Sequence, residues 1–159
     1  MDLTVEEYRK QAEAGDLDSI KHIARCYEKG NGVKVDQKEF FKWCQKAAMM
    51  SDAEMQCEVG QCYHFGIGVR KDEKKAFAWF ERAARQGYAQ GQLLLGQMYG
   101  YGWGVRQNYE QALNWYLLAA EQGNPEAMEN VADAYLYGKG VEADGIRAIE
   151  WFEKAAEYD

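Results

Sequence analysis

The chain has 159 residues and a formal net charge of −7, and 47% of its residues are hydrophobic. This composition is typical of a folded domain with a buried core, and the acidic balance argues against binding to nucleic acid or anionic lipid. No apolar run reaches the roughly 18 residues of a membrane span, and the first residues show no signal-peptide pattern. We therefore expect a cytoplasmic protein, or an exported one if a leader has been removed.

The first predicted helix covers residues 4–14. Thr4 and Glu7 have the spacing of a capping box, in which the two residues satisfy each other's backbone N–H groups. This stretch matches only the second half of the repeat that follows it, with Glu7 where the later copies have tryptophan. We therefore expect residues 1–15 to form an N-terminal cap.

From residue 16 onward the sequence repeats every 36 residues without insertion or deletion. The copies are residues 16–51, 52–87, 88–123 and 124–159. Each copy contains a pair of alanines, a tyrosine and a Gly-x-Gly-Val segment at corresponding places. Each also contains one recurring tryptophan, which we expect to be buried: Trp43, Trp79, Trp115 and Trp151.

Each copy is predicted to form two helices. In the second copy, Val59 and Tyr63 share one helical face, and Gly66 stands where a helix C-terminus favours a left-handed residue. Asp72 is a good N-cap for the second helix of the copy, and its counterparts are also good N-caps. With the N-terminal cap, the chain is expected to contain helices near residues 4–14, 16–29, 36–50, 52–65, 72–86, 88–101, 108–122, 124–137 and 144–157.

The segment from Tyr99 through Gly102-x-Gly104-Val105 to Asn108, continued by Ala112, Trp115-Tyr116 and Ala119-Ala120, resembles the Sel-one-like repeat (SLR) family. The resemblance covers almost the whole chain. It implies an all-α fold, a right-handed α/α superhelix or solenoid of four helix pairs plus the cap, in one domain. It also implies a role as an adaptor or scaffold in protein complexes, and it implies no catalytic residue.

The sequence offers little that could support catalysis, a metal or a cofactor. His22 and Cys26 are four residues apart on one helix, which is half of a zinc site. However, the residues at the same position as Cys26 in the other copies, here called a column, are small apolar core residues. The four cysteines occupy unrelated columns, so we expect no disulfide, and Cys57 is the one expected to be partly exposed. No nucleophile elbow or P-loop is present. We therefore predict a protein that is not an enzyme and binds no metal or cofactor.

The first helix of each pair lines the concave groove in helix-pair solenoids, so its exposed columns are the predicted binding surface. The groove is expected to be basic in the first repeat and aromatic or acidic later. The candidate partner-binding residues are Arg25, Gln61, Phe65, Ile67, Leu94, Gln97, Tyr101, Trp103 and Tyr137.

Trp103 has no tryptophan counterpart in the other copies, where Asn31, Ile67 and Lys139 occupy its position. Either it contributes to a binding patch, as exposed aromatic residues often do, or it folds back as local packing. A rival apolar patch is predicted at Leu117, next to Leu118, on the opposite side.

We predict a protein or peptide as the partner. Two alternatives stay open, a dedicated neutraliser of one toxin or enzyme and, less favoured, a weak hydrolase. The last helix has no following repeat in this sequence, so we expect Ile149, Phe152 or Ala156 to be partly exposed. That surface would serve homodimerisation, or it would show that the chain is part of a longer array.

Overall fold

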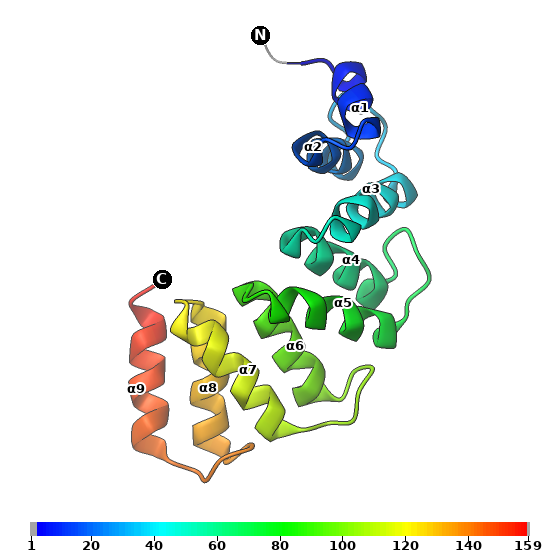
Figure 1. The fold of residues 1–159 in the computed structure, drawn as a ribbon. Helices are drawn as coiled ribbons and strands as arrows, with labels where there is room; N and C mark the ends of the chain where they lie inside the picture. Colours follow the sequence, from blue (N-terminus) through cyan, green and yellow to red (C-terminus); the bar gives the residue numbers. More distant parts are fainter. Residues whose placement is uncertain (1–2, 159) are drawn as a thin grey trace. The chain divides into compact units, whose positions relative to one another are not determined.

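The computed structural model describes residues 3–158, and every secondary-structure element in that range is a helix. The prediction of an all-α fold is therefore confirmed for the described residues, and each predicted helix lies within about one residue of the observed one at both ends. The helices are α1 (Val5–Glu13), α2 (Leu17–Lys29), α3 (Gln37–Met49), α4 (Ala53–Phe65), α5 (Glu73–Arg85), α6 (Ala89–Tyr101), α7 (Tyr109–Glu121), α8 (Pro125–Tyr137) and α9 (Gly145–Ala156) (Figure 1).

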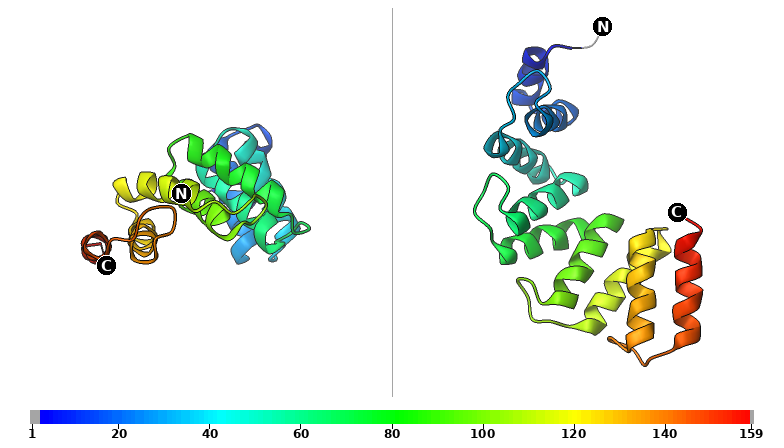
Figure 2. Two further views of the ribbon diagram at one scale, coloured as in Figure 1. Left: turned by 90° about the horizontal axis from the view of Figure 1, so that it is seen from below. Right: turned by 180° about the vertical axis from the view of Figure 1, so that it is seen from behind.

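The chain divides within α5 into two compact parts, residues 1–79 and residues 80–159, and each is described by itself. In the N-terminal part, α1 packs against α2, α2 against α3, and α3 against α4. In the C-terminal part, α6 packs against α7, α7 against α8, and α8 against α9. The last two helices run antiparallel side by side in both Figure 1 and Figure 2. Helices that follow each other in the sequence thus pair within each part, as expected of a repeat protein.

Side-chain caps determine where most helices begin. The Thr4 side chain accepts a hydrogen bond from the Glu7 backbone, and the Glu7 carboxylate accepts one from the Thr4 N–H, so the capping box is confirmed. Pro125 occupies the first turn of α8, where its missing N–H costs nothing. The four predicted N-caps of the second helices all accept hydrogen bonds from backbone N–H groups of the following turn: Asp36, Asp72, Asn108 and Asp144.

The two glycines of a Gly-x-Gly turn have different structural roles. Gly66 ends α4 in the left-handed region, with φ at 74°, as predicted. Gly68, also left-handed with φ at 67°, lies against the preceding repeat, and a Cβ there would overlap the carbonyl oxygen of Gln37, the first residue of α3. In the C-terminal part, Gly140 lies in the same way against Tyr109, the first residue of α7. The second glycine therefore lets the turn contact the backbone of the previous repeat.

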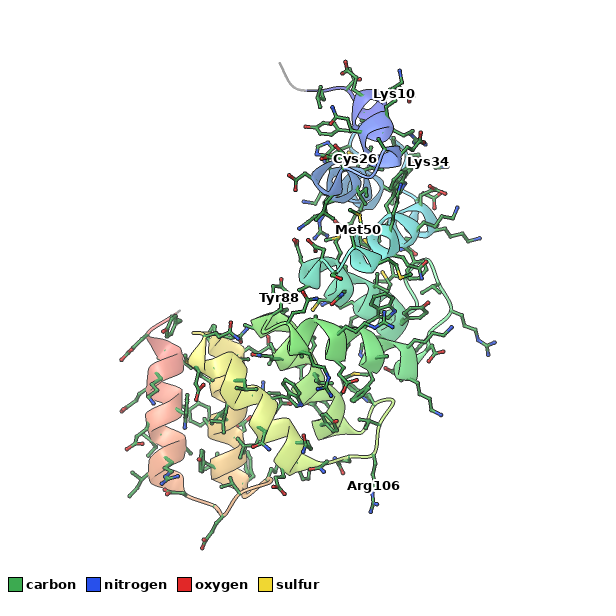
Figure 3. All side chains as sticks on the ribbon, in the orientation of Figure 1. Lys10, Cys26, Lys34, Met50, Tyr88 and Arg106 are labelled. Atoms are coloured by element: carbon green, nitrogen blue, oxygen red, sulfur yellow. The ribbon has the colours of Figure 1, made fainter. Side chains whose placement is uncertain are left out.

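The core of the C-terminal part consists of large side chains that pack around paired alanines. Ala119 is fully buried and Ala120 is 2% exposed. Figure 3 shows side chains filling the spaces between neighbouring helices, whereas Arg106, in the turn after α6, points away from them. The large members of this core are Leu93, Leu113, Tyr116, Met128 and Val131.

The prediction that the recurring tryptophans are buried is right only for Trp79, which is 9% exposed. Trp43, Trp115 and Trp151 are half-buried. In the first three copies the residue after the tryptophan is buried in the core, as Tyr116 is at 7% exposure. Successive residues on a helix are about 100° apart, so the tryptophan covers the edge of the helix pair.

The last helix exposes apolar side chains, as expected. Ile149 is 60% exposed, Phe152 is 38% exposed, and Ala156 is also exposed. Ile146, where other copies have Lys38, Lys74 or Glu110, is 74% exposed. Whether this surface pairs with a second copy stays a prediction.

We predict that Gly140→Ala destabilises the chain more than Gly87→Ala does. Both glycines have positive φ, so either alanine costs about 1 kcal/mol of strain, but a Cβ at Gly87 meets nothing within 4 Å. The overlap with the backbone of Tyr109 should raise the total loss at Gly140 to about 2–4 kcal/mol. Urea unfolding of the two variants measures the difference, and equal losses would show that the turn does not hold the repeats together.

Candidate functional site

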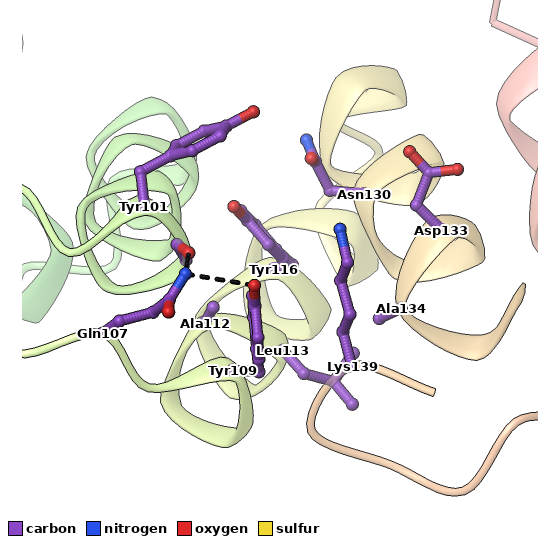
Figure 4. Close-up of a pocket in the computed structure, with 11 residues that line it drawn as sticks. Tyr101, Gln107, Tyr109, Ala112, Leu113, Tyr116, Asn130, Asp133, Ala134 and Lys139 are labelled. Atoms are coloured by element: carbon purple, nitrogen blue, oxygen red, sulfur yellow. Dashed lines mark hydrogen bonds between the residues drawn. The ribbon is translucent and has the colours of Figure 1, made fainter. Parts of the chain in front are cut away.

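Two hollows open at the same place in the repeat, one in each part of the chain. The C-terminal hollow has a volume of about 150 Å³ and lies between α6, α7 and α8 (Figure 4). The N-terminal hollow, of about 340 Å³, lies between α2, α3 and α4. Eight of the nine residues that line the N-terminal hollow have their counterpart, 72 positions later, in the lining of the C-terminal one. The hollow is therefore a feature of the repeat, and the side chains that line it differ from copy to copy.

The lining of the C-terminal hollow includes several oxygen atoms that can accept hydrogen bonds. Gln107 Nε2 donates hydrogen bonds to the Gly100 carbonyl oxygen at 2.7 Å and to the Tyr109 hydroxyl at 3.1 Å. Asn130 Nδ2 donates to the Glu126 carbonyl oxygen at 2.8 Å. Gln107 thus uses both of its N–H groups within the protein and Asn130 uses one of its two, and both leave their side-chain carbonyl oxygens as acceptors. The Asp133 carboxylate adds a negative charge to the same lining.

Tyr116 forms the floor of the C-terminal hollow. Its side chain is 7% exposed, and its hydroxyl points between Tyr101 and Asn130 (Figure 4) without a hydrogen-bond partner among the described residues. Burial raises the pKa of this phenol, which stays neutral. The hydroxyl is not needed for packing, because the second copy has Phe80 in the same column at 2% exposure.

Aromatic rings form the rim of the C-terminal hollow. Tyr101 and Trp103 are stacked with their ring centroids 4.5 Å apart, and they are 63% and 37% exposed. The Lys139 ammonium lies 5.6 Å from the ring centroid of Tyr109 and 5.5 Å from that of Tyr137, within the range of cation–π attraction. Exposed rings at this rim are therefore available for stacking and already attract a cation.

The N-terminal hollow is more apolar. Phe40 and Cys62 lie in its lining and are 5% and 1% exposed, and Val35 and Ile67 add further aliphatic surface. Its lining also includes Glu58, whose carboxylate pairs with Arg25. This hollow is suited to an aliphatic or aromatic side chain.

The predicted binding residues divide between the two parts. Gln61, Phe65 and Ile67 line the N-terminal hollow, and Tyr101 lines the C-terminal one. The remaining candidates do not line either hollow. Leu94 and Gln97 on α6 are half-buried, Trp103 stacks on Tyr101, and Tyr137 at the end of α8 contacts Lys139.

Arg25 does not make the first repeat basic, which corrects the expectation for that region. Its Nη2 lies 2.8 Å from a Glu58 carboxylate oxygen and 3.2 Å from one of Glu54, and its Nη1 lies 3.2 Å from one of Glu28. Burial alone would lower the pKa of Arg25, but the carboxylates of Glu58 and Glu28 raise it overall. Its charge is therefore balanced within the protein.

Gln97 occupies the same repeat position as Arg25 and makes the same kind of contact. Its Nε2 donates a hydrogen bond to a Glu126 carboxylate oxygen at 2.9 Å, as Arg25 bonds Glu54 in the N-terminal part. Both side chains thus join one first helix to the next. This contact between helices is enough to explain why Arg25 and Gln97 occur at these positions, and no binding partner is needed to explain them.

Tyr116, Asn130, Asp133 and Lys139 are not among the candidate residues predicted from the sequence, although Asn130 and Asp133 lie on exposed columns of the first helices. The ring of Tyr116 belongs to the core. The hydroxyl of Tyr116 could have indicated a role beyond packing, because the other copies have Cys44, Phe80 and Phe152 at this repeat position and none of them carries a hydroxyl.

The rival apolar patch on α7 is only partly present. Leu117 is half-buried and packs against the core, whereas Leu118 is 44% exposed. A single exposed leucine is common on protein surfaces and does not define a site.

His22 and Cys26, the two residues considered for a metal site, make other contacts in the structure. His22 stacks on Tyr8 with ring centroids 3.8 Å apart, and Cys26 is 3% exposed. Residues 3–158 contain no group of three or more His, Cys, Asp or Glu side chains that could hold a metal ion. Within the same range, no helix is long and apolar enough to span a membrane.

The four cysteines are free and buried. The expectation that Cys57 is partly exposed is wrong, because this residue packs inward on α4 and is 4% exposed. Burial raises the pKa of both Cys57 and Cys62 to about 12. Neither thiol is therefore placed to act as a nucleophile near neutral pH.

The sequence profile of the Sel1 repeat matches residues 19–52, 53–88, 89–124 and 125–157. Comparison with curated proteins gave no significant match. Among solved structures, a Sel1 repeat protein from Oxalobacter formigenes is 32% identical, with a TM-score of 0.93 over 98% of this chain and 64% of that chain.

Two further solved structures are similar. The protein c5321, a protective antigen present in uropathogenic Escherichia coli strains and displaying an SLR fold, is 33% identical, with a TM-score of 0.94 over 98% of this chain and 33% of that one. The immunity protein Pa5087 from Pseudomonas aeruginosa is 20% identical, with a TM-score of 0.57 over 97% of this chain and 73% of that one. The chain thus spans less than two thirds of the first two relatives, and its likeness to the third concerns the fold alone.

We predict that the cysteines of the native chain resist alkylation at pH 8. A raised pKa leaves little thiolate at that pH, and burial of Cys57 and Cys62 blocks the reagent as well. Mass spectrometry after a brief iodoacetamide treatment should find the native chain unlabelled and the urea-unfolded chain labelled four times. Rapid labelling of native Cys57 would restore the expectation that it is exposed.

Proposed function

The chain belongs to the Sel1 repeat family, whose members are generally protein-interaction scaffolds, and we propose that it binds a peptide or a protein surface on the face formed by the first helices of its repeats. In this role it acts as an adaptor rather than as an enzyme. The partner contributes side chains that enter the hollows between successive repeats.

One observation carries this proposal. The hollow recurs at the same repeat position in both parts of the chain, but the side chains that line it differ in character. Packing residues such as the alanine pairs stay the same from copy to copy, while the lining changes from Ile67 to Lys139 and from Gln61 to Asp133. Residues that packing does not constrain are free to match a partner, which favours recognition of one particular sequence.

A second candidate function is neutralisation of one toxin or enzyme. The solved structures of similar fold include immunity proteins from Pseudomonas aeruginosa. In that case the captured partner would be an enzyme, and the purified chain would inhibit it in stoichiometric amounts. An adaptor would leave the activity of its partner unchanged.

We also propose a cytoplasmic location and a homodimer formed through α9. The first is supported by four cysteines that each have a separate, buried position, and the second by the exposure of Ile149 and Phe152. Sedimentation of the purified chain and of Ile149→Glu tests the dimer. A monomeric parent chain would contradict it.

The experiment that tests the main proposal is capture of partners from a lysate on the immobilised full chain, followed by mass spectrometry. We expect a small number of proteins that elute together with the chain. Binding must then be reproduced with the purified partner. A purified partner that binds the chain equally well after its first-helix face is altered would contradict the proposal.

We predict that Trp103→Ala, alone or with Tyr101→Ala, weakens binding of the purified partner by at least about 1–2 kcal/mol, because exposed aromatic residues dominate interface energies. Unfolding should change little, because the other copies have Asn31, Ile67 or Lys139 at that position. The matched control is Leu118→Ala, which truncates an apolar side chain of similar exposure, 44% against 37%, on α7. If the control weakens binding and Trp103→Ala does not, the α7 surface is the interface.

A further inference from the structure

We propose that the C-terminal hollow is a binding site for an arginine side chain of the partner. This inference rests on the proposed function and specifies the chemistry of one of its sites. The hollow, of about 150 Å³, has room for one large side chain rather than for a whole element of structure.

The arrangement of donors and acceptors carries the inference. Both N–H groups of Gln107 and one of the two N–H groups of Asn130 are already used in internal hydrogen bonds, and the side-chain oxygens of both residues remain as acceptors. The Asp133 carboxylate has no ion-pair or hydrogen-bond partner among residues 3–158. A ligand with several N–H donors and a positive charge complements this lining, and a guanidinium group provides five donors in one plane.

Tyr116 gives an independent indication that something binds here. Its side chain is more than nine-tenths buried, yet its hydroxyl points into the hollow without a hydrogen-bond partner. The hydroxyl oxygen reaches solvent only through the hollow that it faces, and packing at this repeat position does not need a hydroxyl, since Phe80 and Cys44 occupy it in other copies. A bound arginine would donate to this oxygen.

Rings and net charge favour the same ligand. Tyr101 at the rim is exposed and stacked on Trp103, so its outer face is available to a planar guanidinium. Residues 80–159 contain twelve acidic and six basic side chains, whereas residues 1–79 contain fourteen and thirteen. The C-terminal part therefore attracts basic segments more strongly than the N-terminal part.

Lys139 provides a test of the sign of the charge. It is the basic residue of the lining, and its ammonium lies over Tyr109 and Tyr137. A guanidinium in the hollow would be repelled by it, whereas a carboxylate would be attracted. Lys139→Gln and Asp133→Asn should therefore change the affinity for a basic peptide in opposite directions.

The probes are acetylated and amidated tetra-arginine, tetra-lysine and tetra-glutamate, titrated into the full chain at fixed ionic strength. Nuclear magnetic resonance follows the side-chain amide of Asn130 and the indole N–H of Trp103. We expect tetra-arginine to shift both signals to saturation, tetra-lysine to bind more weakly, and tetra-glutamate to leave them unchanged.

For tetra-arginine, we expect Asp133→Asn to lower the affinity at least about fivefold and Tyr116→Phe about threefold, because each removes an acceptor from the site. Lys139→Gln should raise it about two- to fivefold. The matched control is Glu121→Gln, the same change of charge at an exposed residue of α7 outside the hollow. Urea unfolding checks that Tyr116→Phe keeps its stability, as Phe80 in the second copy leads us to expect.

Three results would overturn the inference. In the first, Glu121→Gln and Asp133→Asn weaken binding equally and Tyr116→Phe has no effect, which is the behaviour of unspecific charge attraction. In the second, tetra-glutamate binds and requires Lys139. In the third, no peptide binds while a purified partner still depends on Trp103, in which case the arginine site is wrong and the proposed function stands.

Discussion

In each part of the chain, one turn lies directly against the backbone of the previous repeat, and this close contact sets the spacing of the repeats. At Gly68 and Gly140, a Cβ would overlap the carbonyl oxygen of the first residue of α3 and of α7. Only glycine permits this contact in the left-handed conformation found there. The contact fixes the distance from one repeat to the next within each part of the chain, and with it the hollow between them.

The same architecture explains why the residues that pack the core differ from the residues proposed to bind a partner. Alanine pairs and the aromatic residue that points into the core are held by neighbouring helices, so their size matters. Residues at the rim of the hollow carry no such restriction, and they differ between the two parts of the chain. Tyr116 belongs to both groups, because its ring packs in the core and its hydroxyl faces the hollow.

The sequence alone predicted the helices and their ends well, because the features that set them are local. The caps at Asp36 and Asn108 act on the N–H groups of the next turn, and the left-handed glycines end helices within one or two residues. The period of 36 residues then transferred each assignment to the other copies without further assumptions.

Properties that depend on contacts between helices were predicted less well. Arg25 was assigned to a basic groove because its charge is visible in the sequence, whereas its partners Glu54 and Glu58 lie on the next first helix. The burial of Trp115 was overestimated because a recurring residue can cover the edge of a helix pair as well as its centre. The acceptor-rich lining of the C-terminal hollow was also missed, since only the hydrogen bonds of Gln107 and Asn130 reveal which atoms remain available.

We propose that a partner binds on the face of the first helices, around the C-terminal hollow. Hydrogen–deuterium exchange of the full chain, with and without a purified partner, locates this surface. We expect slower exchange on binding at the end of α6, in the turn at residues 102–105 and along α8, with α9 unchanged. Protection centred on α9 or on the part of α7 around Leu118, with no change around the hollow, would contradict it.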